Sequence, residues 1–252
     1  MRHSYLDNYS NLNSLIHNID PRIKIISFIT FIFFVISTNA QSYSTFLYYG
    51  ILITLLILES RVPLWFVFRR SLAVLPFVIL IAIFIPFYKE GEVVARYSFV
   101  KITREGLILF WNVIIKSYLS LLSMILLMAS IKFSSFLKAL QQLKIPKLFV
   151  MILSFMYRYI FVLEDELMKM KQAKDARSIS PSRWLDLKSL ANMIGVLFLR
   201  AYERGENVYL AMCSRGFDGT VRTAESSVLR QRDFVFLFFM FSILTTIKIF
   251  GA

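Results

Sequence analysis

Two arginines with small neighbours are the first candidates for chemistry in this chain. They lie in the triplets Ala176-Arg177-Ser178 and Ser214-Arg215-Gly216. Each triplet ends a stripe of apolar residues with three- and four-residue spacing, which predicts that each arginine lies near the end of a helix. A guanidinium with little bulk beside it can enter a groove on another protein and bind carboxylates or carbonyls there. The alternative is that each arginine only interacts with a helix dipole or extends from a membrane surface toward water.

Residues for catalysis or metal binding are scarce. The sequence has two histidines, His3 and His17, both in its polar N-terminal part, and one cysteine, Cys213. It contains no G-x-x-x-x-G-K-[ST] phosphate loop, so we do not expect this chain to hydrolyse ATP. No metal site, cofactor or disulfide framework is predicted. The residues favour a non-catalytic protein that couples to partners.

The composition is that of a membrane protein, with 57% hydrophobic residues and a mean hydropathy of +0.63. Five stretches approach the roughly 20 apolar residues that a spanning helix needs. The first two are short and would need flanking polar residues in the headgroup region. The stretches are residues 23–38, 43–58, 71–88, 107–131 and 233–250. We therefore predict an all-α membrane protein with about five transmembrane helices.

The basic residues predict the orientation of these spans. A sixth apolar stretch, 147–163, would place residues 164–232 outside the cell if it crossed the membrane, and that segment carries 12 Lys and Arg residues. Basic loops favour the cytoplasmic side, and Arg158 interrupts the stretch. We predict that 147–163 is a helix at the interface or against the bundle, with the N-terminus inside. The net charge of +13 then needs no nucleic-acid partner.

The chain is thereby divided into three regions. Residues 1–131 form a membrane part with four spans, residues 132–232 form a helical cytoplasmic or interfacial insert, and residues 233–252 form the last span. Within the first region, Asp20 is predicted to cap a helix that begins at Pro21.

The insert is predicted to contain two long amphipathic helices that cross. Gly216 is the predicted C-cap of the second. Small side chains let helix backbones approach closely, so the crossing is expected at Ala173 on the first helix and at Ala201 and Gly205 on the second.

Lys116 is the one basic residue well inside a predicted span, with Asn112 one turn before it. It marks a buried polar contact to a partner, or the span starts later and Lys116 extends outward. The second interpretation is slightly favoured.

Four pieces of the sequence resemble one known family. They are DPRIK (20–24), LKIPKLFVMILSFMYRYIFVLEDEL (143–167), AKDARS (173–178) and ERGENVYLAMCSRGFDG (203–219). In order and spacing they are similar to the transmembrane T component of energy-coupling factor (ECF) ABC transporters, the EcfT/CbiQ family. The third and fourth pieces together are the most specific.

The resemblance implies a multi-pass scaffold in a bacterial cytoplasmic membrane. It implies two ECF ATPase subunits, which would bind ATP and Mg²⁺, and a substrate-binding S component. Ala176, Arg177 and Ser178 would dock on one ATPase, and Ser214, Arg215 and Gly216 on the other. The intact Arg-Gly-Phe-Asp-Gly run resembles the cobalt/nickel branch, and a vitamin-type T component is the alternative. A membrane-embedded enzyme acting on lipids is the competing class, for which the sequence offers no catalytic constellation.

Overall fold

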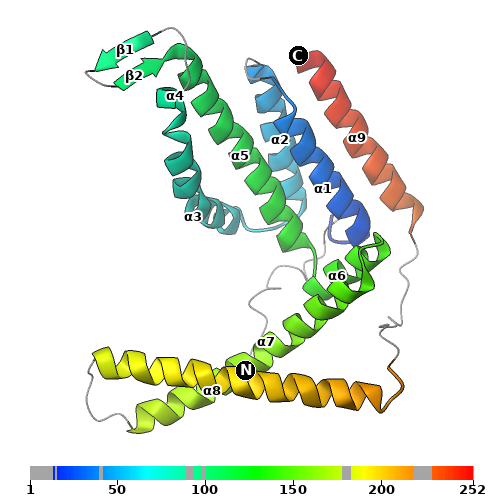
Figure 1. Ribbon diagram of the computed structural model, residues 1–252. Coiled ribbons are helices and arrows are strands. Elements are labelled where there is room, and N and C mark those ends of the chain that lie inside the picture. Colours follow the sequence, from blue (N-terminus) through cyan, green and yellow to red (C-terminus); the bar gives the residue numbers. More distant parts are fainter. Residues whose placement is uncertain are drawn as a thin grey trace. The chain divides into compact units, whose positions relative to one another are not determined.

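The computed structural model describes residues 14, 16–39, 42–88, 93–97, 100–177, 183–217 and 229–251. These residues form helices and one short two-stranded hairpin (Figure 1). The elements are α1 (Pro21–Ile36), α2 (Tyr43–Glu59), α3 (Leu64–Ala82), α4 (Ile85–Tyr88), β1 (Val93–Tyr97), β2 (Val100–Thr103), α5 (Arg104–Ser130), α6 (Phe133–Gln142), α7 (Lys147–Arg177), α8 (Arg183–Cys213) and α9 (Gln231–Gly251). The chain divides into two compact units, a helical bundle formed by residues 4–139 and 226–252, and a smaller unit that contains residues 140–225.

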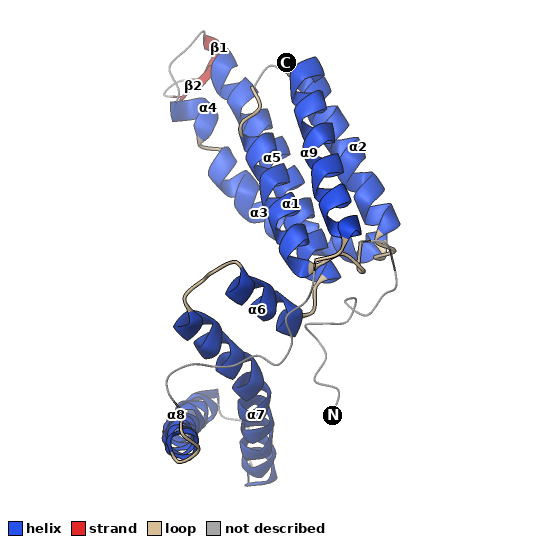
Figure 2. Cartoon of the chain, turned by 90° about the vertical axis from the view of Figure 1, so that its right-hand side faces the viewer, coloured by secondary structure: helices blue, strands red, loops and turns tan. Residues whose placement is uncertain are grey.

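The bundle is built around α1, which packs against α5 and α9, while α2 packs against the same two helices (Figure 2). Its core is apolar and includes Phe28 and Phe31 of α1, Tyr49 of α2 and Leu244 of α9, all at most 1% exposed. The rings of Phe31 and Tyr49 meet edge to face at 5.8 Å. The predicted start of α1 is confirmed, because the Asp20 carboxylate accepts the Arg22 backbone N–H at 2.9 Å and Pro21 is the first helical residue.

Helix α3 and the hairpin differ from the sequence prediction. The apolar stretch 71–88 is not one helix, because α3 begins at Leu64 and ends at Ala82, and the short α4 follows. Pro86 falls in the first turn of α4, where its missing backbone N–H leaves no helical hydrogen bond unmade. The antiparallel pair β1–β2 follows α4 and was not predicted. Thr103 ends β2 and caps α5 by accepting the Gly106 N–H at 3.3 Å.

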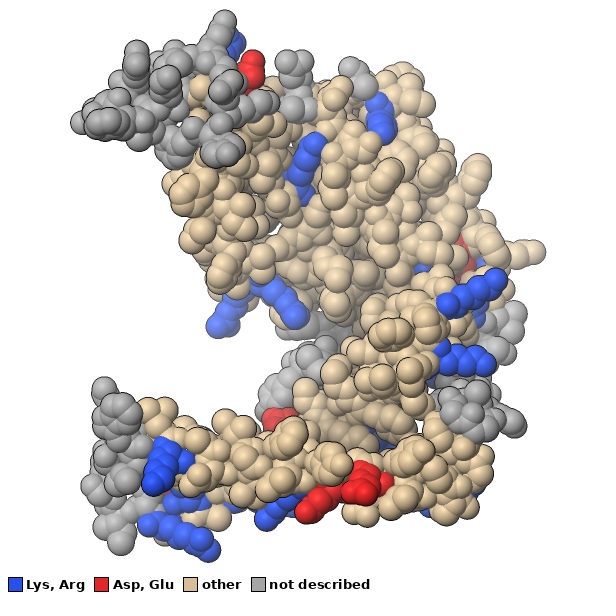
Figure 3. All heavy atoms as spheres, viewed as in Figure 1, with Lys and Arg blue, Asp and Glu red and all other residues tan. Residues whose placement is uncertain are grey.

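Within the described residues, three helices are long and apolar enough to cross a membrane, namely α3, α5 and α9, and the 17-residue α2 is a shorter apolar helix. Large apolar side chains such as Phe77 and Phe238 point outward from the bundle, 71% and 75% exposed. Figure 3 shows that the bundle surface in that view carries few charged residues. Such a surface suits lipid, so the chain is an all-α membrane protein, as predicted.

The smaller unit consists mainly of α7 and α8, which are 31 residues each and pack against one another. The two segments predicted around Leu163 form one continuous helix, because no glycine or proline interrupts residues 147–177. In Figures 1 and 2, α7 and α8 cross near their middles.

Candidate partner-docking site

The first arginine triplet lies at the end of α7. Arg177 is the last helical residue, and both Ala176 and Arg177 are exposed. Ser178 lies outside the described residues. The cation therefore stands at a helix C-terminus, as the apolar stripe predicted, with only the methyl group of Ala176 before it.

The second triplet ends α8 in a Schellman motif. The Phe217 N–H donates to the Met212 carbonyl at 3.1 Å, and the Gly216 N–H donates to the Cys213 carbonyl at 3.0 Å. Gly216 has a φ of 80°, the left-handed conformation that this motif requires. The predicted C-cap at Gly216 is confirmed, and Arg215 becomes the residue that precedes the reversal of the chain.

This cap bears on why the triplet contains an arginine. The last carbonyls of α8 are already bonded, since Ser214 and Arg215 also donate their N–H groups to Leu210 and Met212. The guanidinium of Arg215 is exposed and has no carboxylate partner among the described residues. It is not needed as a cap, so among the described residues the helix dipole is its remaining local interaction, worth about 0.3–1 kcal/mol at an exposed site.

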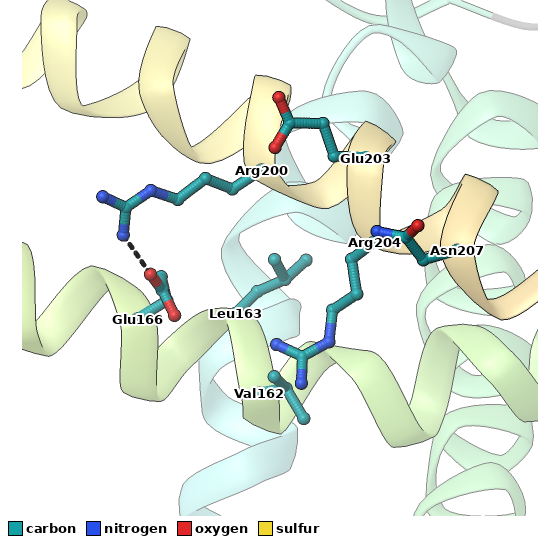
Figure 4. Close-up of a pocket in the computed structure, with 7 residues that line it drawn as sticks. All are labelled: Val162, Leu163, Glu166, Arg200, Glu203, Arg204 and Asn207. Carbon is teal, nitrogen blue, oxygen red and sulfur yellow. Dashed lines mark hydrogen bonds and ion pairs between the residues drawn. The ribbon is translucent and has the colours of Figure 1, made fainter.

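The crossing of α7 and α8 is polar. The Arg200 guanidinium of α8 donates to the Glu166 carboxylate of α7 (Figure 4). The Arg204 guanidinium carbon lies 5.9 Å from the centroid of the Tyr159 ring. The half-buried Val162 and Leu163 of α7 line the same cavity as Glu166, Arg200 and Arg204 (Figure 4).

The small residues predicted to mark this crossing lie in different surroundings. A Cβ built at Gly205 would meet no heavy atom within 4 Å, and Ala173 is exposed, so neither position shows a close approach. Gly205 is more than 90° around α8 from Arg200 and Arg204 at about 100° per residue. Ala201 is half-buried, and its part in the crossing stays a prediction. The side-chain contacts described at the crossing are made by the long residues Arg200, Arg204, Glu166 and Tyr159.

The two arginines stand on opposite sides of the crossing. Helix α7 continues for 14 residues from Leu163 to Arg177, and the chain continues for 11 residues from Arg204 to Arg215. At a rise of about 1.5 Å per residue, the arginines lie about 21 Å and about 17 Å from the crossing. Figure 1 shows the two helices leaving the crossing in opposite directions.

Comparison with known proteins assigns the chain to a family. The profile of the CbiQ family, described as cobalt transport protein, matches residues 12–225 and includes both triplets. The chain belongs to the CbiQ family. An uncharacterized protein of Methanocaldococcus jannaschii is 27% identical over 96% of this chain and 84% of its own length. Energy-coupling factor transporter transmembrane proteins EcfT are 29% identical in Listeria innocua, over 92% of this chain and 91% of theirs, and 29% in Staphylococcus aureus, over 85% and 84%.

A buried charge cluster joins the ends of two bundle helices in this CbiQ-family chain. Asp233 of α9 accepts the Asp20 N–H at 3.0 Å and the Arg230 N–H at 2.9 Å. Lys24, 1% exposed, donates to the carbonyls of His17 at 3.1 Å and Ser130 at 3.0 Å. Asp20, Asp233 and Lys24 interact electrostatically. The DPRIK piece therefore fixes how α1, α5 and α9 meet.

Sequence reasoning missed Asp233, because it entered only as the first residue of the predicted span 233–250. The sequence does carry a signal for it, because a carboxylate in the first turn of an apolar helix needs a hydrogen-bond donor when it is buried.

Lys116 of the CbiQ-family bundle also binds within the chain. Its ammonium donates to the carbonyls of Ile36 at 2.9 Å and Thr38 at 2.6 Å, at the C-terminal end of α1. Lys248 of α9 donates to the Ser37 hydroxyl at 3.0 Å at the same end. Neither sequence interpretation of Lys116, a partner contact or an outward extension, included this contact within the chain. The lysine stabilises carbonyls that α1 itself leaves unpaired.

Proposed function

We propose that this chain is the non-catalytic T component of an ECF-type ABC importer. It would couple ATP hydrolysis by two partner ATPase subunits to uptake by a substrate-binding S component. The observation that carries the proposal is the pair of exposed arginines at the C-terminal ends of two long crossed helices, about 21 Å and about 17 Å from the crossing on opposite sides. That geometry suits two separate grooves, one on each ATPase. ATP and Mg²⁺ would be bound by those subunits.

We place the chain in the cytoplasmic membrane with its N-terminus inside and about five spans. Residues 1–131 and 233–252 form the membrane part in this proposal, and residues 132–232 form the cytoplasmic or interfacial coupling region. The support is the excess of Lys and Arg in residues 164–232 together with the apolar surfaces of α3, α5 and α9.

For the substrate we propose cobalt or nickel ions. The Arg-Gly-Phe-Asp-Gly run and the family's description as cobalt transport protein support this branch. The EcfT relatives keep a vitamin-type importer as the second candidate. Uptake of labelled cobalt, nickel and vitamins by cells that express the chain with its partners separates the two.

The test of docking replaces both arginines, Arg177→Glu and Arg215→Glu. Truncating one charge-paired interface arginine costs about 2–5 kcal/mol, and reversing both charges sets like charges against acidic groove walls. We expect the double variant to reach the membrane, because both side chains are exposed, but to lose its ATPase subunits on purification in mild detergent and to lose uptake.

The matched control is Lys169→Glu with Lys188→Glu, which makes the same charge change at exposed positions on the same two helices. This control should keep its ATPases. Retention of stoichiometric ATPase by the arginine variant would overturn the docking proposal. Equal loss in the lysine control would assign the effect to bulk charge. A membrane enzyme acting on lipids would purify without ATPases in every case.

A further inference from the structure

The crossing of α7 and α8 carries two polar ties. One tie is the Arg200–Glu166 ion pair, and the other is the Arg204 guanidinium against the Tyr159 ring. In the sequence, Val162 and Leu163 lie between the α7 residues of the two ties, and both line the cavity beside Arg200 and Arg204 (Figure 4). Glu166 and Tyr159 are seven residues apart on one face of α7, and Arg200 and Arg204 are four apart on one face of α8.

Two separated contacts restrict the crossing angle of α7 and α8, which a single contact does not. Apolar side chains at a single crossing point leave the helices free to change their crossing angle, because dispersion contacts are not directional. A second contact, at a distance from the first, resists this change in the crossing angle. The ion pair is too exposed to add much to folding stability, since the Arg200 side chain is 55% and the Glu166 side chain 25% exposed. The effect of these ties is therefore on geometry.

We propose that Glu166, Arg200, Tyr159 and Arg204 form a latch that sets the α7–α8 crossing angle, and with it the separation of Arg177 and Arg215. The functional part of this inference rests on the proposed coupling role. A change of about 10° in the crossing angle moves a helix end that is about 17–21 Å away by about 3–4 Å. That displacement is the length of a hydrogen bond, enough to take an arginine out of its groove.

An open cavity beside the latch leaves room for this motion. It has a volume of about 390 Å³ and is lined by the latch residues Glu166, Arg200 and Arg204 together with Glu203 and Asn207. Closing or widening the angle would therefore not force close-packed side chains through one another. The charged lining also offers Arg200 alternative acceptors, such as Glu203, once the tie to Glu166 opens.

The test measures the separation of the helix ends directly. Nitroxide labels are attached to the native Cys213 and to Ala176→Cys in the full chain in lipid nanodiscs, and the distance between them is measured by pulsed electron paramagnetic resonance. We expect one narrow distribution for the parent chain. Glu166→Arg or Arg200→Glu should shift or broaden it by about 3 Å or more. The swapped pair, Glu166→Arg with Arg200→Glu, should restore it.

Two further variants separate the latch from general charge effects. Glu206→Arg, an exposed residue of α8, makes the same charge change as Glu166→Arg and should leave the distribution unchanged. Tyr159→Phe keeps an aromatic face for Arg204 and should behave as the parent, whereas Tyr159→Ala should broaden the distribution. An unchanged distribution in Glu166→Arg, or no recovery in the swapped pair, overturns the latch.

The functional readout is the ratio of ATP hydrolysed to substrate imported by the assembled, unlabelled transporter. We expect each single variant to raise this ratio several-fold and the swapped pair to restore it. If the distances respond but no ATPase assembles with the parent chain, the proposed function fails and the structural latch stands. If the parent assembles and transports but the distances do not respond, the latch alone fails.

Discussion

Replacing Asp233 by alanine should strongly destabilise the bundle. The carboxylate is 4% exposed and accepts two backbone N–H groups, from Asp20 at 3.0 Å and from Arg230 at 2.9 Å. Hydrogen bonds to a charged group contribute about 1.5–3 kcal/mol each, so the loss of both removes about 3–6 kcal/mol. Lys24 would also lose one of its two nearby carboxylates while still buried, which adds to the cost.

The assay is thermal denaturation of the purified chain in mild detergent, followed by far-ultraviolet circular dichroism. Glu105→Ala is the matched control, because Glu105 is also an acidic residue in the first turn of a bundle helix but is exposed. It should lose only its interaction with the helix dipole, about 0.3–1 kcal/mol. Asp233→Asn keeps one acceptor oxygen and should fall between the two. If Asp233→Ala and Glu105→Ala have the same melting temperature, the buried cluster does not hold α9 to α1.

Three other changes have defined outcomes. Gly216→Ala forces a side chain into a left-handed conformation at a cost of about 1–2 kcal/mol, so it should fray the end of α8 and weaken ATPase retention; fully retained ATPase would show that the cap does not position Arg215. Lys116→Met should lower the melting temperature by removing the donor to two carbonyls, while Lys132→Met, at an exposed lysine outside those contacts, should not. Cysteine placed at position 252 should react with an impermeant reagent on intact cells and cysteine at 182 should not; reaction at 182 would contradict the proposed orientation.

The sequence predicted the helices most reliably where apolar periodicity and an end signal coincide. Asp20-Pro21 marks the start of α1 and Gly216 the end of α8, and both signals act through the local backbone. The break after Ala82 and the β1–β2 hairpin were missed. The stretch 71–88 was predicted as one span because its apolar length alone is sufficient for one. The effect of Pro86 depends on whether it falls in the first turn of a helix, which the sequence alone does not show.

The candidate site also has a part that the sequence predicted and a part that it did not. The positions of Arg177 and Arg215 at helix ends followed from spacing, because seven residues return a side chain to nearly the same face of a helix. The polar contacts of the crossing did not follow from the sequence. Glu166 and Arg200 pair across 34 residues, and such a pairing has no local signal.

The interactions found in the two units differ in strength, and this difference makes function separable from stability. In the bundle, Asp233 and Lys24 are buried and bonded at short distance, so a change there should cost several kcal/mol of folding free energy. At the crossing, Glu166 and Arg200 are partly in water, where an ion pair contributes about 0.2–1 kcal/mol. If α7 and α8 transmit motion, the contacts between them must be weak, like the Glu166–Arg200 pair. A contact that opens in each transport cycle must not cost more free energy than partner binding provides. Bundle variants should therefore lower the melting temperature while the surviving complexes keep their ratio of ATP hydrolysed to substrate imported. Crossing variants should change that ratio with the melting temperature nearly unaltered.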